Sequence, residues 1–138
     1  MYASIAGYCF KIFKLSCMIF KKTLVLGASE NPGRYSNLAI RKLRSYKHPV
    51  IAIGRKNGIV DDVPITSEKN AYPDIDTVTV YLNEVNQQEY YDYILNLAPK
   101  RIIFNPGAEN SQLTILAKNK GIQVINACTL VMLSTGQY

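Results

Sequence analysis

Histidine, cysteine and tryptophan are scarce in this chain of 138 residues, which has one histidine, three cysteines and no tryptophan. The single histidine, His48, excludes any site that needs several imidazole ligands or a pair of histidines. The cysteines Cys9, Cys17 and Cys128 lack CxxC spacing and are odd in number, which argues against a disulfide scaffold and a structural zinc site. We therefore expect reduced thiols, no bound metal and a cytoplasmic location.

A long apolar run is also missing. Residues 2–20 are fairly apolar, but Lys11 and Lys14 interrupt them before they reach the roughly 18 residues that a membrane span needs. The same lysines lie inside the apolar stretch rather than before it, unlike the basic residues of a secretory signal. A weakly amphipathic surface helix is the less favoured interpretation. We expect residues 1–20 to be an N-terminal extension, with residues 1–17 poorly ordered or loosely docked, and we expect no membrane partner.

The chain has an excess of positive charge, because 16 Lys and Arg residues against 10 Asp and Glu give a formal net charge of +6. Setting aside residues 1–17 removes two lysines and no acidic residue, which leaves +4. This excess suits an anionic partner. The length suits one domain, which we place at residues 21–138, and it excludes a two-domain ligase or dehydrogenase with one domain for each substrate.

Short apolar or β-branched runs alternate with segments of helical periodicity. Strands are predicted at residues 23–27, 50–54, 76–82, 101–104 and 122–126, and helices near residues 36–44, 87–98, 113–120 and 128–133. Residues 55–74 are rich in turn formers, and this composition predicts only a short extended segment there. Strands separated by helices are typical of parallel sheets with right-handed crossovers. The sequence thus predicts an α/β fold, a Rossmann-like doubly wound sheet of about five mainly parallel strands with helices on both faces.

In such sheets, ligands bind beyond the carboxyl ends of the strands, so the loop at residues 27–36 is informative. Gly27 ends the first strand and a helix begins near Ser36, which brings backbone N–H groups and the positive helix end around one spot. That spot suits a phosphate, and Arg34 can add a positive charge to it. The pattern is not GxGxxG, because Ser29 replaces the second glycine. A tight turn without a ligand is therefore the alternative.

The loop after the second predicted strand distinguishes between nucleotides. NAD-binding sheets usually carry an acidic residue there, which holds the ribose 2′-hydroxyl. This chain has Arg55 and Lys56 instead, which suit a phosphorylated ribose such as that of NADP or of the 3′-phospho-AMP part of coenzyme A. Solvated loop charges are an equally open interpretation.

The order of these motifs resembles a known family, the small CoA-binding domain proteins. The similarity lies in the runs Thr23-Leu-Val-Leu-Gly-Ala-Ser29, Asn31-Pro-Gly-Arg-Tyr-Ser36, Ile102-Ile-Phe-Asn-Pro-Gly-Ala-Glu-Asn110 and Ala127-Cys-Thr-Leu-Val-Met132. Family members are single-domain relatives of the N-terminal CoA-binding domain of the succinyl-CoA ligase α-subunit. The resemblance covers about residues 20–138. It departs after the second strand, where many relatives have Asn-Pro and this chain has Gly54-Arg55.

The resemblance implies non-catalytic binding of coenzyme A or acyl-CoA through the strand-end loops. In this hypothesis the first loop contacts the phosphates, the second lies near the adenosine and its 3′-phosphate, and the third and fourth flank the ligand. The implied site residues are Gly27, Ala28, Ser29, Asn31, Pro32, Arg34, Tyr35, Ser36, Gly54, Arg55, Tyr81, Leu82, Asn83, Asn105, Pro106 and Gly107.

The sequence shows no catalytic constellation, so we predict that the protein is not an enzyme. In the ligase, the phosphorylated histidine belongs to a second domain that this chain lacks, and we expect His48 at the surface or at a strand edge. Cys128 lies in an apolar run, which predicts a buried structural thiol rather than a nucleophile. Glu109 is better explained as a residue that caps a helix or complements its dipole than as a base.

Two other functions stay open. One is a small NADP-dependent reductase, although a proton donor is not evident in the sequence. The other is a basic interaction module built on the cationic residues between positions 41 and 47, with nucleic acid not the expected partner. Tyr90, Tyr91 and Tyr93 lie along one predicted helix, where core packing with an exposed aromatic edge is favoured over a surface for homo-oligomer formation.

Overall fold

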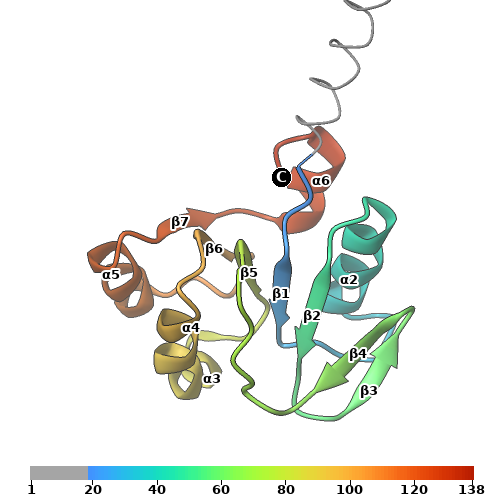
Figure 1. Cartoon of the computed structure of the whole chain (residues 1–138), viewed down its shortest axis with the longest axis horizontal. Helices are drawn as coiled ribbons and strands as arrows, with labels where there is room; N and C mark the ends of the chain where they lie inside the picture. Colours follow the sequence, from blue (N-terminus) through green and yellow to red (C-terminus); the bar gives the residue numbers. More distant parts are fainter. Residues whose placement is uncertain (1–18) are drawn as a thin grey trace, which may run out of the picture.

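The structure is a computed structural model that describes residues 19–138, so our expectation for residues 1–17 lies outside the described residues. A seven-stranded sheet in the order β3-β4-β2-β1-β5-β6-β7 forms the centre of the molecule (Figure 1). Within this sheet all neighbouring strands are parallel except β3 and β4. The prediction of a Rossmann-like α/β fold is confirmed, with seven strands rather than about five.

The elements follow the predicted alternation, with short strands and helices of one to three turns. In chain order they are β1 (Thr23–Leu26), α2 (Tyr35–Ser45), β2 (Val50–Ile53), β3 (Gly58–Val60), β4 (Val63–Thr66), β5 (Thr77–Val80), α3 (Glu84–Gln87), the 3-10 helix η1 (Gln88–Tyr90), α4 (Tyr91–Leu97), β6 (Arg101–Phe104), α5 (Ser111–Asn119), β7 (Gln123–Asn126) and α6 (Thr129–Thr135).

The two additional strands, β3 and β4, form a hairpin within residues 55–74, for which only a short extended segment was predicted. Asp61 and Asp62 make the turn, and Asp61 takes a positive φ of 51°. Val60, Val63 and Ile65 are buried in the core that also holds Ile40 and Leu43 of α2, which explains why so short a hairpin is retained. Pro64 lies just before Ile65, where the pairing of β4 with β2 begins, so its missing N–H leaves that ladder intact.

The helices cover both faces of the sheet, as predicted. Leu24 and Leu26 of β1 point to a core shared with Ile94 of α4 and Leu113 of α5. Val25, between them, points to a second core, which is closed by side chains of α2 and α6. Successive residues of a strand face opposite sides, so burial on both faces requires the continuous apolar run seen in the sequence.

The chain order places a topological switch point between β1 and β5. From β1 the chain passes through α2 to β2 on one side, and after the hairpin it returns to β5 on the other side. The loops after β1 and β5 therefore part at the carboxyl edge of the sheet, which is the lower edge in Figure 1. Such a crevice is where Rossmann-like sheets hold their ligands.

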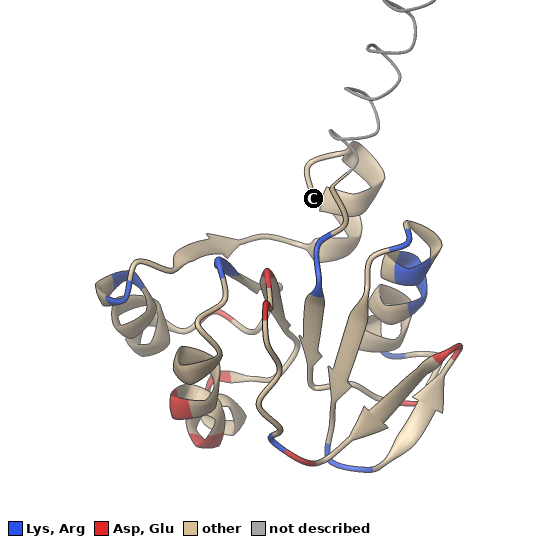
Figure 2. Cartoon of the chain, viewed as in Figure 1, with Lys and Arg blue, Asp and Glu red and all other residues tan. Residues whose placement is uncertain are grey.

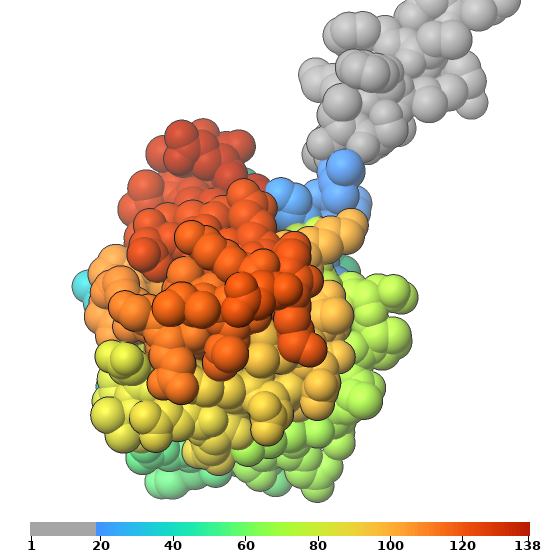
Figure 3. All heavy atoms as spheres, turned by 90° about the vertical axis from the view of Figure 1, so that its left-hand side faces the viewer, coloured from blue at the N-terminus to red at the C-terminus, as the bar shows by residue number. Residues whose placement is uncertain are grey.

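The opposite, amino edge of the sheet brings the two ends of the described chain together. The blue residues that lead into β1 lie beside the red segment of α6 in Figures 1 and 3. Lys21 Nζ contacts the carbonyl oxygen of Tyr138, and the Tyr138 ring packs on His48 and on the Arg101 guanidinium. Among residues 19–138 there is no helix long and apolar enough to cross a membrane.

Candidate functional site

A cavity of about 790 Å³ opens at the carboxyl edge of the sheet, within the range of known small-molecule sites. All four strand-end loops singled out in the sequence contribute to it. Of the sixteen implied site residues, all but Pro32 and Asn105 line the cavity. The lining consists of Gly27, Ala28, Ser29, Glu30, Asn31, Arg34, Tyr35, Ser36, Gly54, Arg55, Lys56, Tyr81, Leu82, Asn83, Asn86, Glu89, Tyr90, Pro106, Gly107 and Ala108. We call this cavity the strand-end pocket.

The first loop is held in shape by its own polar groups. The Asn31 N–H donates to Ser29 Oγ at 3.1 Å, and the Gly33 N–H donates to Asn31 Oδ1 at 2.9 Å. Asn37 of α2 reaches back and donates from Nδ2 to the Ser29 carbonyl oxygen at 3.0 Å. These contacts fix the loop as a series of side-chain turns rather than as a glycine-rich loop. The loop is thus ordered, although Ser29 stands where the GxGxxG pattern has its second glycine.

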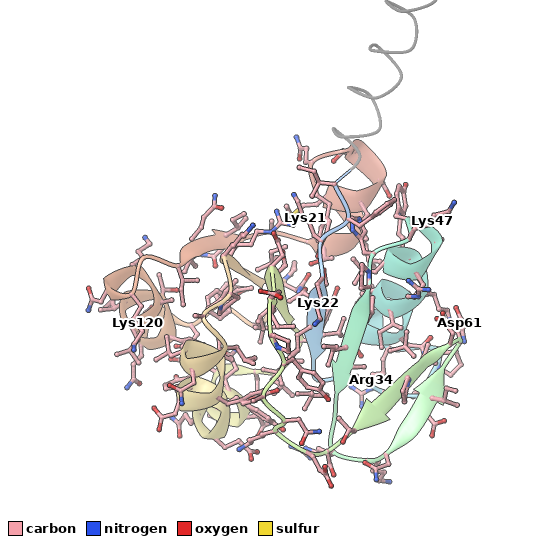
Figure 4. The ribbon with its side chains drawn as sticks, viewed as in Figure 1. Lys21, Lys22, Arg34, Lys47, Asp61 and Lys120 are labelled. Carbon is pink, nitrogen blue, oxygen red and sulfur yellow. The ribbon has the colours of Figure 1, made fainter. Side chains whose placement is uncertain are left out.

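The N-terminus of α2 points into the strand-end pocket without a cap from the protein. Arg34 is the N-cap residue, its side chain makes no capping hydrogen bond, and no acidic residue lies in the first turn. The N–H groups that open a helix have no partner within it, and they carry the positive end of the helix dipole. In the described part of the chain, this end is therefore available to an anion. Figure 4 labels Arg34 at this lower end of α2 and Lys47 near its upper end.

Two glycines allow the loops to approach one another at the floor of the pocket. A Cβ on Gly54 would lie 2.3 Å from the carbonyl oxygen of Ala28, so the end of β2 and the first loop meet backbone to backbone. Gly27 has a φ of +92°, and a Cβ there would lie 3.1 Å from Leu82. Glycine is required at both positions, at Gly54 by space and at Gly27 by backbone conformation.

Three basic and two acidic side chains line the pocket, but the acids have partners outside it. The Glu30 carboxylate accepts from the Ile59 N–H at 3.1 Å, and the Glu89 carboxylate lies 3.3 Å from Lys69 Nζ. The basic side chains of the lining, Arg34, Arg55 and Lys56, form no ion pair with the described residues. Figure 2 shows blue at the lower edge of the sheet, where β2 leads into β3. The pocket consequently presents positive charge that the described protein does not neutralise.

The loop after β6 holds one implied site residue that the structure places elsewhere. Asn105 is buried, and its Nδ2 donates to Thr79 Oγ1 at 2.7 Å and to the Val80 carbonyl oxygen at 3.0 Å. Its Oδ1 accepts from the Thr129 N–H at 2.9 Å, which ties β6 to the start of α6. The side chain therefore supports the carboxyl edge from inside the sheet and does not line the cavity.

Six residues line the pocket without being in the implied set. Lys56 was weighed beside Arg55, and Glu30 follows Ser29 in the first loop. Asn86, Glu89 and Tyr90 come from α3 and η1, whose start is fixed by Asn83 Oδ1 accepting from the Asn86 N–H at 2.9 Å. Helical spacing from Asn83 is the sequence signal that points to Asn86 and Tyr90. Ala108 continues the loop from Gly107 and completes the six.

The nucleophiles and acids considered for catalysis do not meet in the pocket. His48 lies at the amino edge, two residues before β2, in keeping with the strand-edge alternative, and it is only 8% exposed, so the surface alternative is wrong. The Cys128 thiol is half-buried at the start of α6, less buried than predicted. The Glu109 carboxylate accepts from the Gly107 N–H at 2.6 Å, whereas Asn110 is the residue that caps α5. Residues 19–138 contain no cluster of metal-ligating side chains.

Tyr81 is the titratable lining residue with the most perturbed environment. Burial raises the pKa of its phenol far above the ordinary value of 10, and contacts near Thr129 and Thr79 oppose that rise in part. The hydroxyl therefore stays protonated throughout the physiological range. Tyr81 thus contributes shape to the pocket but no base, and its hydroxyl is buried without a hydrogen-bond partner among the described residues.

Comparison with known proteins identifies a family and similar folds. A family model described as "CoA binding domain" matches residues 21–134. A solved structure described as an uncharacterized protein is 47% identical, with a TM-score of 0.85 over 87% of this chain and 99% of that one. Two others show the fold alone: one from Thermus thermophilus (18% identity, TM-score 0.77, 91% of this chain and 97% of that one) and a hypothetical protein from Pyrococcus horikoshii (21%, 0.76, 84% and 83%). No curated protein matches the chain.

The fold and the pocket at its switch point define a Rossmann-like protein of the ligand-binding kind. The chain belongs to the CoA binding domain family, whose model covers nearly all of the described residues.

Proposed function

We propose that the chain binds coenzyme A or acyl-CoA in the strand-end pocket and does not catalyse a reaction of the bound ligand. The observation that carries this proposal is the uncapped N-terminus of α2 opening into a cavity whose basic side chains lack ion-pair partners among the described residues. Coenzyme A carries a pyrophosphate and a 3′-phosphate, so it needs two separated positive sites. Arg34 with α2 forms one such site, and Arg55 with Lys56 forms the other.

Each part of the ligand has a counterpart in the lining. The pyrophosphate suits the N–H groups at Tyr35 and Ser36 together with the Arg34 guanidinium, which can donate two hydrogen bonds in parallel. The 3′-phosphate and adenosine suit the end of β2, in line with the family resemblance. Leu82 and Pro106 supply apolar surface where the loops after β5 and β6 face the cavity.

The non-catalytic part of the proposal rests on the chemistry of the lining. Covalent catalysis needs a nucleophile beside a base. The hydroxyl oxygen of Ser29 accepts a hydrogen bond from the Asn31 N–H, and both acidic side chains of the lining have partners elsewhere. The lining residues are therefore suited to holding a ligand.

Isothermal calorimetry with coenzyme A, NADP and NAD tests the proposal directly. We expect saturable binding of coenzyme A and on the order of tenfold weaker binding after Arg34→Ala, as for a lost hydrogen bond to a charged group. Arg41→Ala is the matched control, because it removes the same charge from the same helix outside the strand-end pocket. The proposal fails if coenzyme A does not bind. The phosphate assignment alone fails if both variants bind equally well.

A 2′-phosphorylated dinucleotide is the second candidate ligand. The observation that favours it is the Arg55-Lys56 pair at the end of β2, where an NAD site has an acid. Tight binding of NADP in the same calorimetry, with no binding of coenzyme A, would select this function over the first.

A further inference from the structure

Gln87 occupies an unusual place for a polar residue, because it is fully buried at the end of α3. Its side-chain Nε2 donates to the Leu82 carbonyl oxygen at 2.8 Å and to the Ala108 carbonyl oxygen at 2.7 Å. Leu82 belongs to the loop after β5 and Ala108 to the loop after β6. One amide group thus bridges two loops that line the strand-end pocket.

The orientation of this amide is fixed by a second buried residue. Gln87 Oε1 accepts from Asn110 Nδ2 at 2.9 Å, and Asn110 Nδ2 also donates to the Tyr91 hydroxyl oxygen at 2.8 Å. Asn110 Oδ1 is held in turn by the Leu113 N–H at 2.9 Å. A reversed Gln87 amide would turn its oxygen towards two carbonyl oxygens, so the hydrogen-bonding network selects the arrangement observed.

The bridge is needed because the β-ladder between these strands stops short of the pocket. The register of β5 and β6 ends at the pair Val80 and Phe104, and the next backbone contact, from the Asn105 N–H to the Val80 carbonyl oxygen, is already 3.4 Å. Beyond it the two loops have no ladder to set their separation. The two hydrogen bonds from Gln87 are shorter than this last backbone contact and lie beyond it along the chain.

We propose that Gln87 is a positioning residue of the ligand site, which sets the spacing between the loops after β5 and β6. This inference rests on the proposed function, because ligand affinity is its readout. Gln87 itself does not line the cavity, so it acts through the backbone of Leu82 and Ala108. Loss of the bridge leaves the buried Ala108 carbonyl oxygen and the part-buried Leu82 carbonyl oxygen without this donor and lets the walls of the pocket separate.

The test compares coenzyme A affinity in Gln87→Leu, Gln87→Glu and the wild type. Leucine fills a similar space without a donor, and we expect on the order of tenfold weaker binding, as for the loss of one to two hydrogen bonds. Glutamate in its charged form faces two carbonyl oxygens, whereas its protonated form can donate to one of them. We therefore expect Gln87→Glu to bind more weakly at pH 8 and to recover part of its affinity at pH 6, relative to the wild type at each pH.

Two controls separate positioning from simple loss of stability. Gln88→Glu introduces the same charge at the neighbouring exposed position, and Ile94→Ala destabilises a buried site in α4 that is not part of the pocket. Both should keep wild-type affinity while folded. Equal affinity of Gln87→Leu and wild type, or no pH-dependent recovery in Gln87→Glu, overturns the inference. Failure of the wild type to bind coenzyme A would instead overturn the proposed function.

Discussion

Gly58 and Glu30 meet at the rim of the strand-end pocket, where the carboxylate of Glu30 occupies the space that a side chain at Gly58 would need. A Cβ on Gly58 would lie 2.3 Å from the Glu30 carboxyl carbon, and the Ile59 N–H donates to Glu30 Oε2 at 3.1 Å. The backbone of the edge strand β3 thus holds the negatively charged carboxylate of Glu30, which belongs to the first loop. Without this contact, the same charge is free to turn towards the phosphates of the proposed ligand.

We predict that Gly58→Ala weakens coenzyme A binding by roughly two- to fivefold, the size of one exposed charge interaction. The φ angle of Gly58 is compatible with alanine, and the exposed Glu30 side chain is easier to displace than the backbone of β3. Glu30 would then lie closer to the anionic ligand. Calorimetry at low ionic strength measures the change, which should shrink as salt is added.

The control for this prediction is the same substitution in a Glu30→Ala background. If Gly58 acts through the carboxylate, Gly58→Ala has no further effect on affinity once that group is gone. An equal loss in both backgrounds would show that alanine acts through the backbone of the hairpin.

Gly54→Ala is predicted to be costly for folding. Its Cβ would lie 2.3 Å from the carbonyl oxygen of Ala28, and both partners are backbone at the closely packed end of β2. We expect a loss of about 1–3 kcal/mol in the free energy of unfolding, the usual range for overpacking. Chemical denaturation measures it. Gly33→Ala is the matched control, because its Cβ meets only the Asn31 side chain, at 3.3 Å, and it should cost little. Equal stability of both variants would contradict the prediction.

The environment of His48 predicts that the folded protein loses stability in mild acid. Its Nδ1 accepts from the Lys21 N–H at 2.9 Å, which only an unprotonated nitrogen can do. Burial lowers the pKa of His48 below the ordinary 6.5, and the nearby charges of Lys21 and Arg101 lower it further. The unfolded chain therefore takes up the proton first, so stability that is present above about pH 6.5 declines as the pH falls below that value.

Denaturation midpoints between pH 8 and pH 5 test this relationship. The variant His48→Gln keeps an acceptor but cannot take up a proton, so its stability should change less over the range in which the wild type weakens. A wild-type stability that stays constant or rises as the pH falls from 6.5 would contradict the assigned direction of the pKa shift.

The sequence was sufficient for the layered α/β fold but not for the full width of the sheet. Continuous apolar runs such as the one at Leu24–Leu26 are buried on both faces. The alternation of strands with helices correctly predicted that most strands run parallel. The hairpin of β3 and β4 was underestimated, because each strand has three or four residues and β4 contains Pro64. Its stability depends on burial of Val60, Val63 and Ile65 against distant residues, which local pattern does not reveal.

The candidate site was predictable to the extent that strand ends determine it. The rule that ligands bind at carboxyl edges led to the loops that line the cavity. The same rule cannot separate Asn105 from Pro106, although one is buried in the sheet and the other lines the pocket. The role of the Gln87 amide was equally unpredictable, because only the packing of two loops around its side chain gives it that role.

The proposed recognition of the 3′-phosphate by Arg55 and Lys56 predicts a difference between two ligands. Both side chains are exposed at the end of β2, and neither pairs with an acid among residues 19–138. We expect the wild type to bind coenzyme A more tightly than 3′-dephospho-CoA. The double variant Arg55→Ser/Lys56→Ser should lose most of that preference, with roughly tenfold weaker binding of coenzyme A from the two lost charge interactions.

Dephospho-CoA provides the internal control, because its affinity should be nearly the same in the wild type and in the double variant. Lys118→Ser/Lys120→Ser removes the same total charge at the end of α5, away from the pocket, and should leave the preference for coenzyme A intact. Figure 4 labels Lys120 at the far left, remote from Arg34. If Arg55→Ser/Lys56→Ser weakens both ligands equally, these charges act on the pyrophosphate or through the general field, since a contact with the 3′-phosphate can affect only the ligand that carries it.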